Sequence, residues 1–216
     1  DYGATKYTCN VTNNYFSDNY ANVSGGGIYL VGNNTIISKN TFLNNKATTT
    51  AAGGITIHGH NSVVSDNVFK SNKAGNSGGA VYWEGNNAKF TNNEISNCHS
   101  GTSGGGLYLK GASATIKNNK FTSNSAGTIG GAIQLSSKNV KIAKNKFTKN
   151  SAAYSGGAIY MDSKNAQITS NTFTSNKAGS TSSGGAIRLV GHYATIKSNT
   201  FEKNTAKTGK SIAGRI

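Results

Sequence analysis

The sequence predicts an all-β fold, a right-handed parallel β-helix solenoid of about eight laps of 26–28 residues. Three observations support it. A Gly-Gly-x-apolar unit recurs once per lap, an Asn-x-Phe unit recurs with it, and the composition combines 28 glycines with no proline. Helical repeats would instead show a 3.6-residue period and few Asn or β-branched residues.

The Gly-Gly-x-apolar unit predicts a tight turn followed by a strand. Glycine permits a positive φ or a close approach of two backbones, and residues of the strand then face alternately inward and outward. The apolar fourth residues of the unit are Ile28, Ile55, Val81, Leu107, Ile133, Ile159 and Ile187. With two further short strands before the next unit, we expect three strands in each lap.

The second unit places an Asn two residues before a Phe. These asparagines are Asn14, Asn40, Asn67, Asn93, Asn119, Asn145, Asn171 and Asn199. We expect them to form a structural ladder at a turn, in which each amide bonds the next lap and satisfies buried backbone groups. A second Asn follows three residues after the Phe in seven of the eight copies, and Cys98 interrupts that column.

Equivalent residues of successive laps should stack as interior columns. The first column is Val11, Ile37, Val64, Phe90, Ile116, Ile142, Ile168 and Ile196. The second is Leu30, Ile57, Trp83, Leu109, Leu135, Met161 and Leu189, and the third is the Phe column, with Ile95 in place of one Phe. In residues 78–103 the changes to Trp83, Phe90 and Ile95 suggest mutual compensation of interior volume.

The whole chain, residues 1–216, is predicted to be a single β-helix repeat domain. It has no transmembrane run and no secretory signal peptide. Residues 209–212 resemble the start of another unit, and neither end shows the amphipathic cap that solenoids need. We therefore expect a segment of a longer surface protein, which leaves the anchoring mode, the full length and the oligomeric state open.

The two cysteines, Cys9 and Cys98, belong to laps three apart, about 14 Å along the axis at the spacing of stacked strands. A disulfide needs Cα atoms within about 7 Å. We expect two free thiols, with Cys9 in an inward column of small residues. The cysteines therefore do not identify the cellular compartment.

Two motifs, GGA[ILV] and FxxN, repeat through essentially the whole chain. The first is complete at residues 78–81, 130–133, 156–159 and 184–187, and the second fails only at 95–98. In this pairing the chain resembles the chlamydial polymorphic membrane proteins and the adhesin-like surface proteins of methanogenic archaea. The resemblance implies a cell-surface passenger or stalk domain used in attachment. The motifs are residues of the scaffold, so they specify the β-helix rather than a ligand.

The acidic residues argue against an enzyme. Glycoside hydrolysis needs two carboxylates about 5–9.5 Å apart, and calcium-dependent lyases need several oxygen ligands together. No two of the seven acids fall in one column of adjacent laps; Glu84 and Asp162 share a column three laps apart. His58 and His60 could share one side of a strand, but only Glu84 is near enough to be a third ligand. We predict no catalytic residue, no metal site and no cofactor.

Two outward features are candidate ligand contacts. The first is the column that follows the apolar residue of each Gly-Gly unit: Tyr29, Thr56, Tyr82, Tyr108, Gln134, Tyr160 and Arg188. Its four tyrosines suggest a platform for sugar rings or for side chains of a partner, because Tyr gives rigid contact area at low entropy cost. The alternative is that Tyr simply favours exposed strand positions.

The second feature is basic. Net charge is +15, and five lysines crowd into one lap at positions 138, 141, 144, 146 and 149. Lys164 should stack on Lys138, and Lys120 on Lys146, at a cost in repulsion that suggests an anionic partner. The alternative is that these lysines maintain solubility and prevent edge-to-edge association. Interleaved aromatic residues are missing, so we expect no specific binding of nucleic acid.

The sequence thus favours a non-enzymatic adhesin or passenger module, extracellular and at the cell surface. Its partners would be glycans or proteins of host or neighbouring cells, with anionic ones attracted by the positive charge. A polysaccharide-active β-helix enzyme, or a degenerate relative of one, and a pure structural spacer are the two alternatives.

Overall fold

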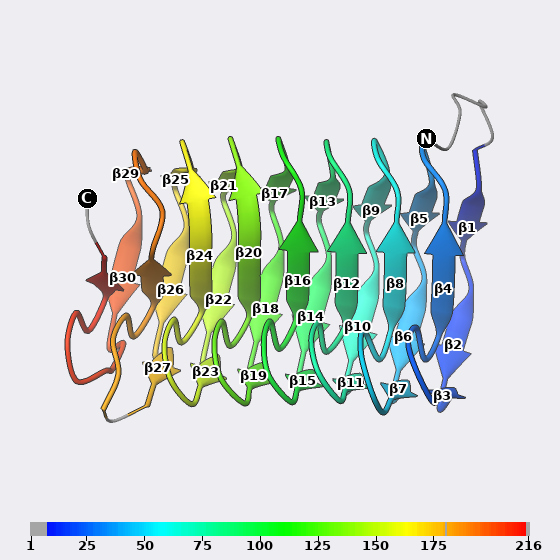
Figure 1. The fold of residues 1–216 in the computed structure, drawn as a ribbon, viewed down its shortest axis with the longest axis horizontal. Coiled ribbons are helices and arrows are strands. Elements are labelled where there is room, and N and C mark those ends of the chain that lie inside the picture. Colours follow the sequence, from blue (N-terminus) through cyan, green and yellow to red (C-terminus); the bar gives the residue numbers. More distant parts are fainter. Residues whose placement is uncertain (1–7, 180, 215–216) are drawn as a thin grey trace.

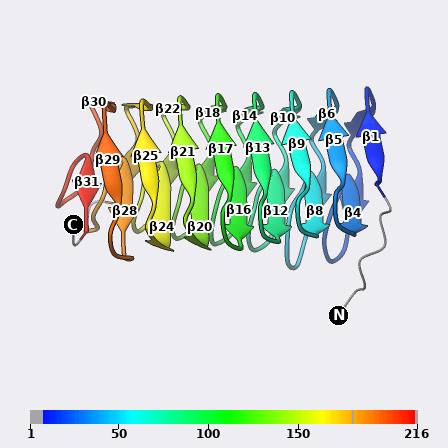
Figure 2. The same cartoon turned by 90° about the horizontal axis from the view of Figure 1, so that it is seen from above.

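The computed structural model describes residues 8–179 and 181–214, in which every regular element is a β-strand. The chain winds as a parallel β-solenoid of about eight laps, and each strand pairs with its equivalents in the laps before and after (Figure 1). Four parallel sheets therefore run along the axis, and Figure 2 shows the same stack from above. The all-β solenoid predicted from the sequence is confirmed.

The first sheet consists of β1 (Asn10–Thr12), β5 (Ile36–Ser38), β9 (Val63–Ser65), β13 (Lys89–Thr91), β17 (Thr115–Lys117), β21 (Lys141–Ala143), β25 (Gln167–Thr169) and β29 (Thr195–Lys197). The second consists of β2 (Tyr15–Ser17), β6 (Thr41–Leu43), β10 (Val68–Lys70), β14 (Glu94–Ser96), β18 (Lys120–Thr122), β22 (Lys146–Thr148), β26 (Thr172–Thr174) and β30 (Thr200–Glu202).

The third sheet consists of the two-residue strands β3 (Tyr20–Ala21), β7 (Lys46–Ala47), β11 (Lys73–Ala74), β15 (His99–Ser100), β19 (Ser125–Ala126), β23 (Ser151–Ala152) and β27 (Lys177–Ala178). The fourth consists of β4 (Ile28–Val31), β8 (Ile55–His58), β12 (Val81–Glu84), β16 (Leu107–Lys110), β20 (Ile133–Lys138), β24 (Ile159–Lys164), β28 (Ile187–Leu189) and β31 (Ile212–Ala213).

The expectation of three strands per lap is wrong, because the third sheet adds a fourth. Its strands have one outward residue and one inward residue, as in Lys46–Ala47. Two residues are too few to produce a visible alternation of polar and apolar positions. The pairing of equivalent laps, as between Lys73 and Lys46, is what makes them strands.

The asparagine ladder lies at the turn between the first and second sheets. Asn119 is representative: its Oδ1 accepts from the backbone N–H of Asn93 at 2.8 Å and from Asn93 Nδ2 at 3.1 Å. Its own Nδ2 donates to the carbonyls of Phe90, 2.9 Å away, and Lys117, 3.1 Å away. Each amide thus satisfies backbone groups that would otherwise be buried without a partner.

Residues in the left-handed backbone conformation form the turns between the strands of a lap. The residue just before each ladder Asn has a positive φ even when it is not glycine, as at Lys39 (58°) and Lys144 (57°). The first glycine of the Gly-Gly unit does the same, for example Gly156 at 68°. The second glycine is required for a different reason: a Cβ on Gly157 would collide with the carbonyl oxygen of Gly185 in the next lap.

The predicted interior columns form one continuous hydrophobic core. In the Phe column adjacent rings stack 4.8–5.1 Å apart wherever both laps supply a Phe. Trp83 is fully buried, and its Nε1 donates to the carbonyl of Gly59 at 3.1 Å. Both thiols are free, but Cys9 is exposed rather than enclosed, since no lap among the described residues lies on its outer side.

Candidate ligand-contact surfaces

The predicted tyrosine column lies on the outward side of the fourth sheet. Register pairs Tyr29 with Thr56, Thr56 with Tyr82, Tyr82 with Tyr108, and continues through Gln134 and Tyr160 to Arg188. Tyr29 is 55% exposed, and the other three tyrosines and Arg188 are half-buried. Contact of these residues with a ligand stays a prediction.

The four tyrosines do not form one open platform. Only Tyr82 and Tyr108 are adjacent, and their rings lie 4.8 Å apart at an interplanar angle of 6°. Parallel rings at that centroid distance must overlap, so one face of each ring is occupied by the other. Thr56 and Gln134 separate this pair from Tyr29 and Tyr160.

Glu84 organises the polar side of the tyrosine pair. It lies two residues after Tyr82 on β12, and the Tyr82 hydroxyl donates to its Oε1 at 2.7 Å. His58 Nδ1 lies 3.3 Å from Oε2, and Lys110 Nζ lies 3.6 Å from Oε1. The three contacting groups come from successive strands β8, β12 and β16, which parallel pairing brings side by side.

These contacts shift two pKa values in opposite directions. The hydrogen bond from Tyr82, followed by the charges of Lys110 and His58, lowers the pKa of Glu84 in spite of its partial burial. Burial, together with the hydrogen bond to Glu84 and its charge, raises the pKa of Tyr82. At neutral pH the phenol is therefore the proton donor and the carboxylate the ionised acceptor.

The two histidines expected to share one side have different roles. His58 lies between tyrosine rings, with centroids 5.6 Å from Tyr29 and 6.1 Å from Tyr82. His60 Nδ1 instead accepts from the backbone N–H of Asn86 at 2.9 Å. Among the described residues, no group of three or more His, Cys, Asp or Glu side chains could hold a metal ion.

A shallow groove of about 400 Å³ lies beside the tyrosine pair. It is lined by Tyr82, Tyr108 and His58 of the fourth sheet and by residues of the turns between the third and fourth sheets. Those turn residues are Ser24, Thr50, Ala51, Asn76 and Ser77. The lining therefore combines aromatic rings with hydroxyl and amide groups.

Two buried oxygens in the tyrosine column have no hydrogen-bond partner. Thr56 is 1% exposed and Gln134 is 7% exposed, and Thr56 Oγ1 and Gln134 Oε1 are both unpaired. They flank the Tyr82–Tyr108 pair on either side. An unpaired buried polar atom costs about 1–3 kcal/mol. Both oxygens are enclosed, and neither Thr56 nor Gln134 lines the groove.

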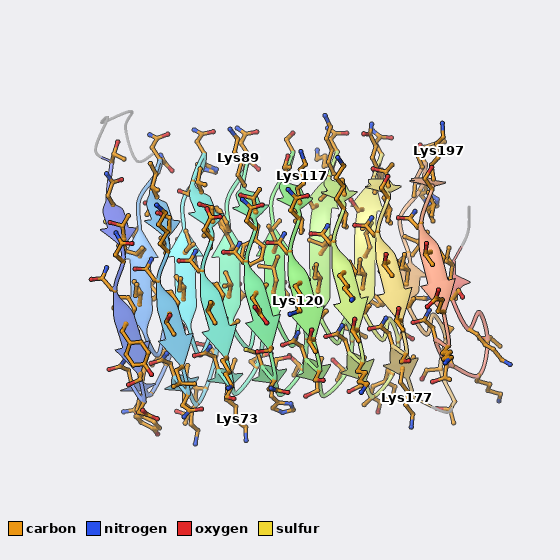
Figure 3. All side chains as sticks on the ribbon, turned by 180° about the vertical axis from the view of Figure 1, so that it is seen from behind. Lys73, Lys89, Lys117, Lys120, Lys177 and Lys197 are labelled. Atoms are coloured by element: carbon orange, nitrogen blue, oxygen red, sulfur yellow. The ribbon has the colours of Figure 1, made fainter. Side chains whose placement is uncertain are left out.

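The sequence interpretation placed the five lysines of residues 138–149 in one patch, but the structure divides them: Lys138 lies on the fourth sheet, whereas Lys141, Lys144 and Lys146 lie on or beside the turn from the first sheet to the second. Lys138 pairs with Lys164 on the fourth sheet, whereas Lys146 pairs with Lys120 on the second sheet. The lap carries its lysines around the perimeter, because 26 residues complete a full turn. Figure 3, seen from behind, shows Lys120 on the second sheet and Lys89, Lys117 and Lys197 along the first.

Sequence reasoning identified the tyrosines but missed the way in which Glu84, His58 and Lys110 surround them. A signal was present: Tyr82 and Glu84 are two residues apart on one strand and must face the same side. The groove residues had no such signal, since Ser, Thr and Asn are common in every turn of this chain.

Comparison with protein-family models identifies one family to which the sequence is similar. The model of the right-handed β-helix region matches residues 3–98 and 53–214, which together span nearly all of the sequence. No curated protein matches the sequence. The solved structure of the Streptococcus pneumoniae surface protein and adhesin PfbA is similar at 14% identity and a TM-score of 0.43, over 93% of this chain and 68% of that one. A similarity this distant carries no argument about function.

No helix in the described part of the chain is long and apolar enough to cross a membrane.

Proposed function

We propose that this chain, which belongs to the family of right-handed β-helix regions, is a non-enzymatic attachment module of an extracellular, cell-surface protein. Its contact face is the outward side of the fourth sheet, around Tyr82 and Tyr108. The ligands we propose are glycans or proteins on the surface of host or neighbouring cells.

One observation carries the proposal: the stacked pair Tyr82–Tyr108 borders a groove lined by hydroxyl and amide groups. Rigid aromatic rings beside a few polar groups are typical of sites that bind sugars or protein side chains.

The chemistry of Glu84 favours binding over catalysis. Its two oxygens are engaged by Tyr82, Lys110 and His58, and its lowered pKa makes it a poor general acid at neutral pH. The next acid in its column, Asp162, is three laps away, about 14 Å at the spacing of stacked strands. That separation exceeds the distance that a carboxylate pair needs for glycoside hydrolysis.

The test compares two double variants of the chain on a panel of surface glycans and whole cells, at low and at high salt. Tyr82→Ala with Tyr108→Ala should abolish binding that survives high salt. Tyr15→Ala with Tyr193→Ala is the matched control, because these tyrosines are 64% and 81% exposed, on the second sheet and in the turn between the fourth and first sheets, and should not be needed.

Equal binding by both variants would reject the tyrosine face. Failure of the unmodified chain to bind any member of the panel would favour the spacer alternative. Turnover of a bound glycan, measured by the release of reducing ends or unsaturated sugars, would overturn the non-enzymatic assignment.

A further inference from the structure

Most of the positive charge follows Glu94, where the sequence has sixteen Lys and Arg and only two acidic residues, Asp162 and Glu202. Between Glu94 and Asp162 the sequence contains no acidic residue and eight lysines, at positions 110, 117, 120, 138, 141, 144, 146 and 149. Five of these eight lie, in two successive laps, on the short first-sheet strands, in the turn that follows them, or at the start of the second-sheet strands. We call this group, Lys117, Lys120, Lys141, Lys144 and Lys146, the lysine corner.

The backbone fixes the arrangement of the corner. Lys117 ends β17 and Lys120 begins β18, with the ladder residue Asn119 buried in the turn between them. In the next lap Lys144 occupies the same turn, and Lys146 pairs in register with Lys120. All five lysines are exposed. Two successive laps thus direct five cations outward from one edge of the solenoid.

Four of these cations lack a counter-ion within the described part of the protein. Lys120 Nζ lies 3.1 Å from Glu94 Oε1. In residues 8–179 and 181–214, no carboxylate lies within 4.0 Å of Lys117, Lys141, Lys144 or Lys146. Lys120 and Lys146 pair in register, where like charges repel, and the other three lysines add to the local positive charge. A polyanion that neutralises them would relieve this repulsion.

The positive charge continues along the axis on the first sheet. Two outward columns of the first sheet carry these lysines. In one column Lys89, Thr115 and Lys141 follow each other in successive laps. In the other, two residues further along each strand, Thr91 pairs with Lys117. A linear polymer running parallel to the axis would therefore meet one cation in each of three successive laps, alternately in two columns about 6.6 Å apart, with an axial step of about 4.8 Å. The threonine hydroxyls between the lysines can donate to its oxygens.

We propose that the lysine corner binds an acidic polysaccharide, a linear polymer with carboxylate or sulfate groups, laid along the solenoid axis. This site is separate from the tyrosine column and does not depend on the function proposed for it. The outward residues around the corner are lysines, threonines and small residues, with no aromatic ring. Single-stranded nucleic acid would need rings on which its bases could stack, and so the corner fits a charged sugar polymer better.

The test measures binding of the chain to four immobilised polymers: polygalacturonate, dextran sulfate, neutral dextran and double-stranded DNA. The corner variant changes Lys117, Lys141, Lys144 and Lys146 to Gln. The matched control changes Lys73, Lys177, Lys203 and Lys207 to Gln, four exposed lysines remote from the corner. Both variants lower the net charge equally, from +15 to +11 (15 − 4), and both replace one left-handed lysine, Lys144 or Lys203.

We expect the unmodified chain to bind one or both acidic polysaccharides, more weakly as salt rises, and not neutral dextran. The corner variant should lose about tenfold or more in affinity, and the control should lose much less, because local charge density governs the interaction. Equal losses of affinity in the two variants would show that binding depends on net charge alone, and would overturn the proposal. Tighter binding to DNA than to either polysaccharide, or no binding to either, would overturn it as well. Circular dichroism of both variants excludes unfolding as the cause.

Discussion

Phe90 supplies the aromatic ring that Ile95 does not. Ile95 lies in register between Phe69 and Phe121, at the one gap in the Phe column. The ring of Phe90, from the neighbouring sheet, is 6.5 Å from that of Phe69 and 6.2 Å from that of Phe121. All four side chains are fully buried. Two substitutions in one lap, one larger and one smaller, thus keep the interior filled.

This relationship predicts energetic coupling between the two positions. Ile95→Phe alone should overpack the core, and Phe90→Ile alone should leave a void, each costing about 1–3 kcal/mol in the free energy of unfolding. The double variant recreates the pattern of the other laps and should cost less than the sum by about 0.5–3 kcal/mol. Urea unfolding of the four proteins measures this coupling, and strictly additive losses would contradict it.

Cys98 is the one interruption of the second asparagine column, and restoring the column should stabilise the protein. Cys98 Sγ lies 3.9 Å from Asn72 Nδ2, where other laps have an amide oxygen that accepts at 2.8–3.0 Å. Cys98→Asn should therefore raise the free energy of unfolding by about 1 kcal/mol or more. The reverse change in a regular lap, Asn150→Cys, is the control and should lower it by about 1–3 kcal/mol. A loss of stability in Cys98→Asn would show that the lap has adapted to the thiol.

The second glycine of the Gly-Gly unit should tolerate no side chain. A Cβ at Gly157 would lie 2.6 Å from the backbone nitrogen of Lys177, besides its collision with the next lap. We expect Gly157→Ala to lower the thermal unfolding midpoint by several degrees, corresponding to about 1–3 kcal/mol or more. Gly32→Ala is the control, because a methyl group there would have no atom within 4 Å and φ is not positive. Similar midpoints for the two variants would refute the close-approach explanation.

The titration of Glu84 should depend on the hydroxyl of Tyr82. Because the folded-state pKa of Glu84 is lowered, its contribution to stability is present above its ordinary pKa and is lost as pH falls through the lowered value. Tyr82→Phe removes the largest cause of the shift and should raise the pKa of Glu84 toward its ordinary range, as followed by carboxyl carbon NMR. Tyr108→Phe keeps the hydrogen bond and should change the pKa far less. An unchanged titration in Tyr82→Phe would assign the shift to Lys110 and His58 instead.

Which residues share the candidate contact face could largely be predicted from their positions in the 26-residue repeat. Parallel stacking puts residues one lap apart side by side, so the positions of Tyr82, Tyr108 and Glu84 on one surface could be deduced from their place in the repeat. The separation of His58 from His60 could not, because Gly59 ends the strand and the chain turns between them. Nor could the stacking of the two tyrosine rings, which depends on their side-chain torsions.

The sequence by itself determined the all-β solenoid, the length of its laps, the inward columns and the asparagine ladder. It could do so because a repeat places equivalent residues in contact many times over, and each copy reinforces the same register. Only the tertiary structure decided that each lap has a fourth strand and a further turn beside it. The two-residue strands leave no pattern in residue type, and the left-handed corners, although mostly Asn, Asp or Ser, also fall at residues such as Lys144. The turns between the sheets separate Lys138 from Lys146 and join Lys117 to Lys120, so the grouping of charges on the surface is a property of the folded lap.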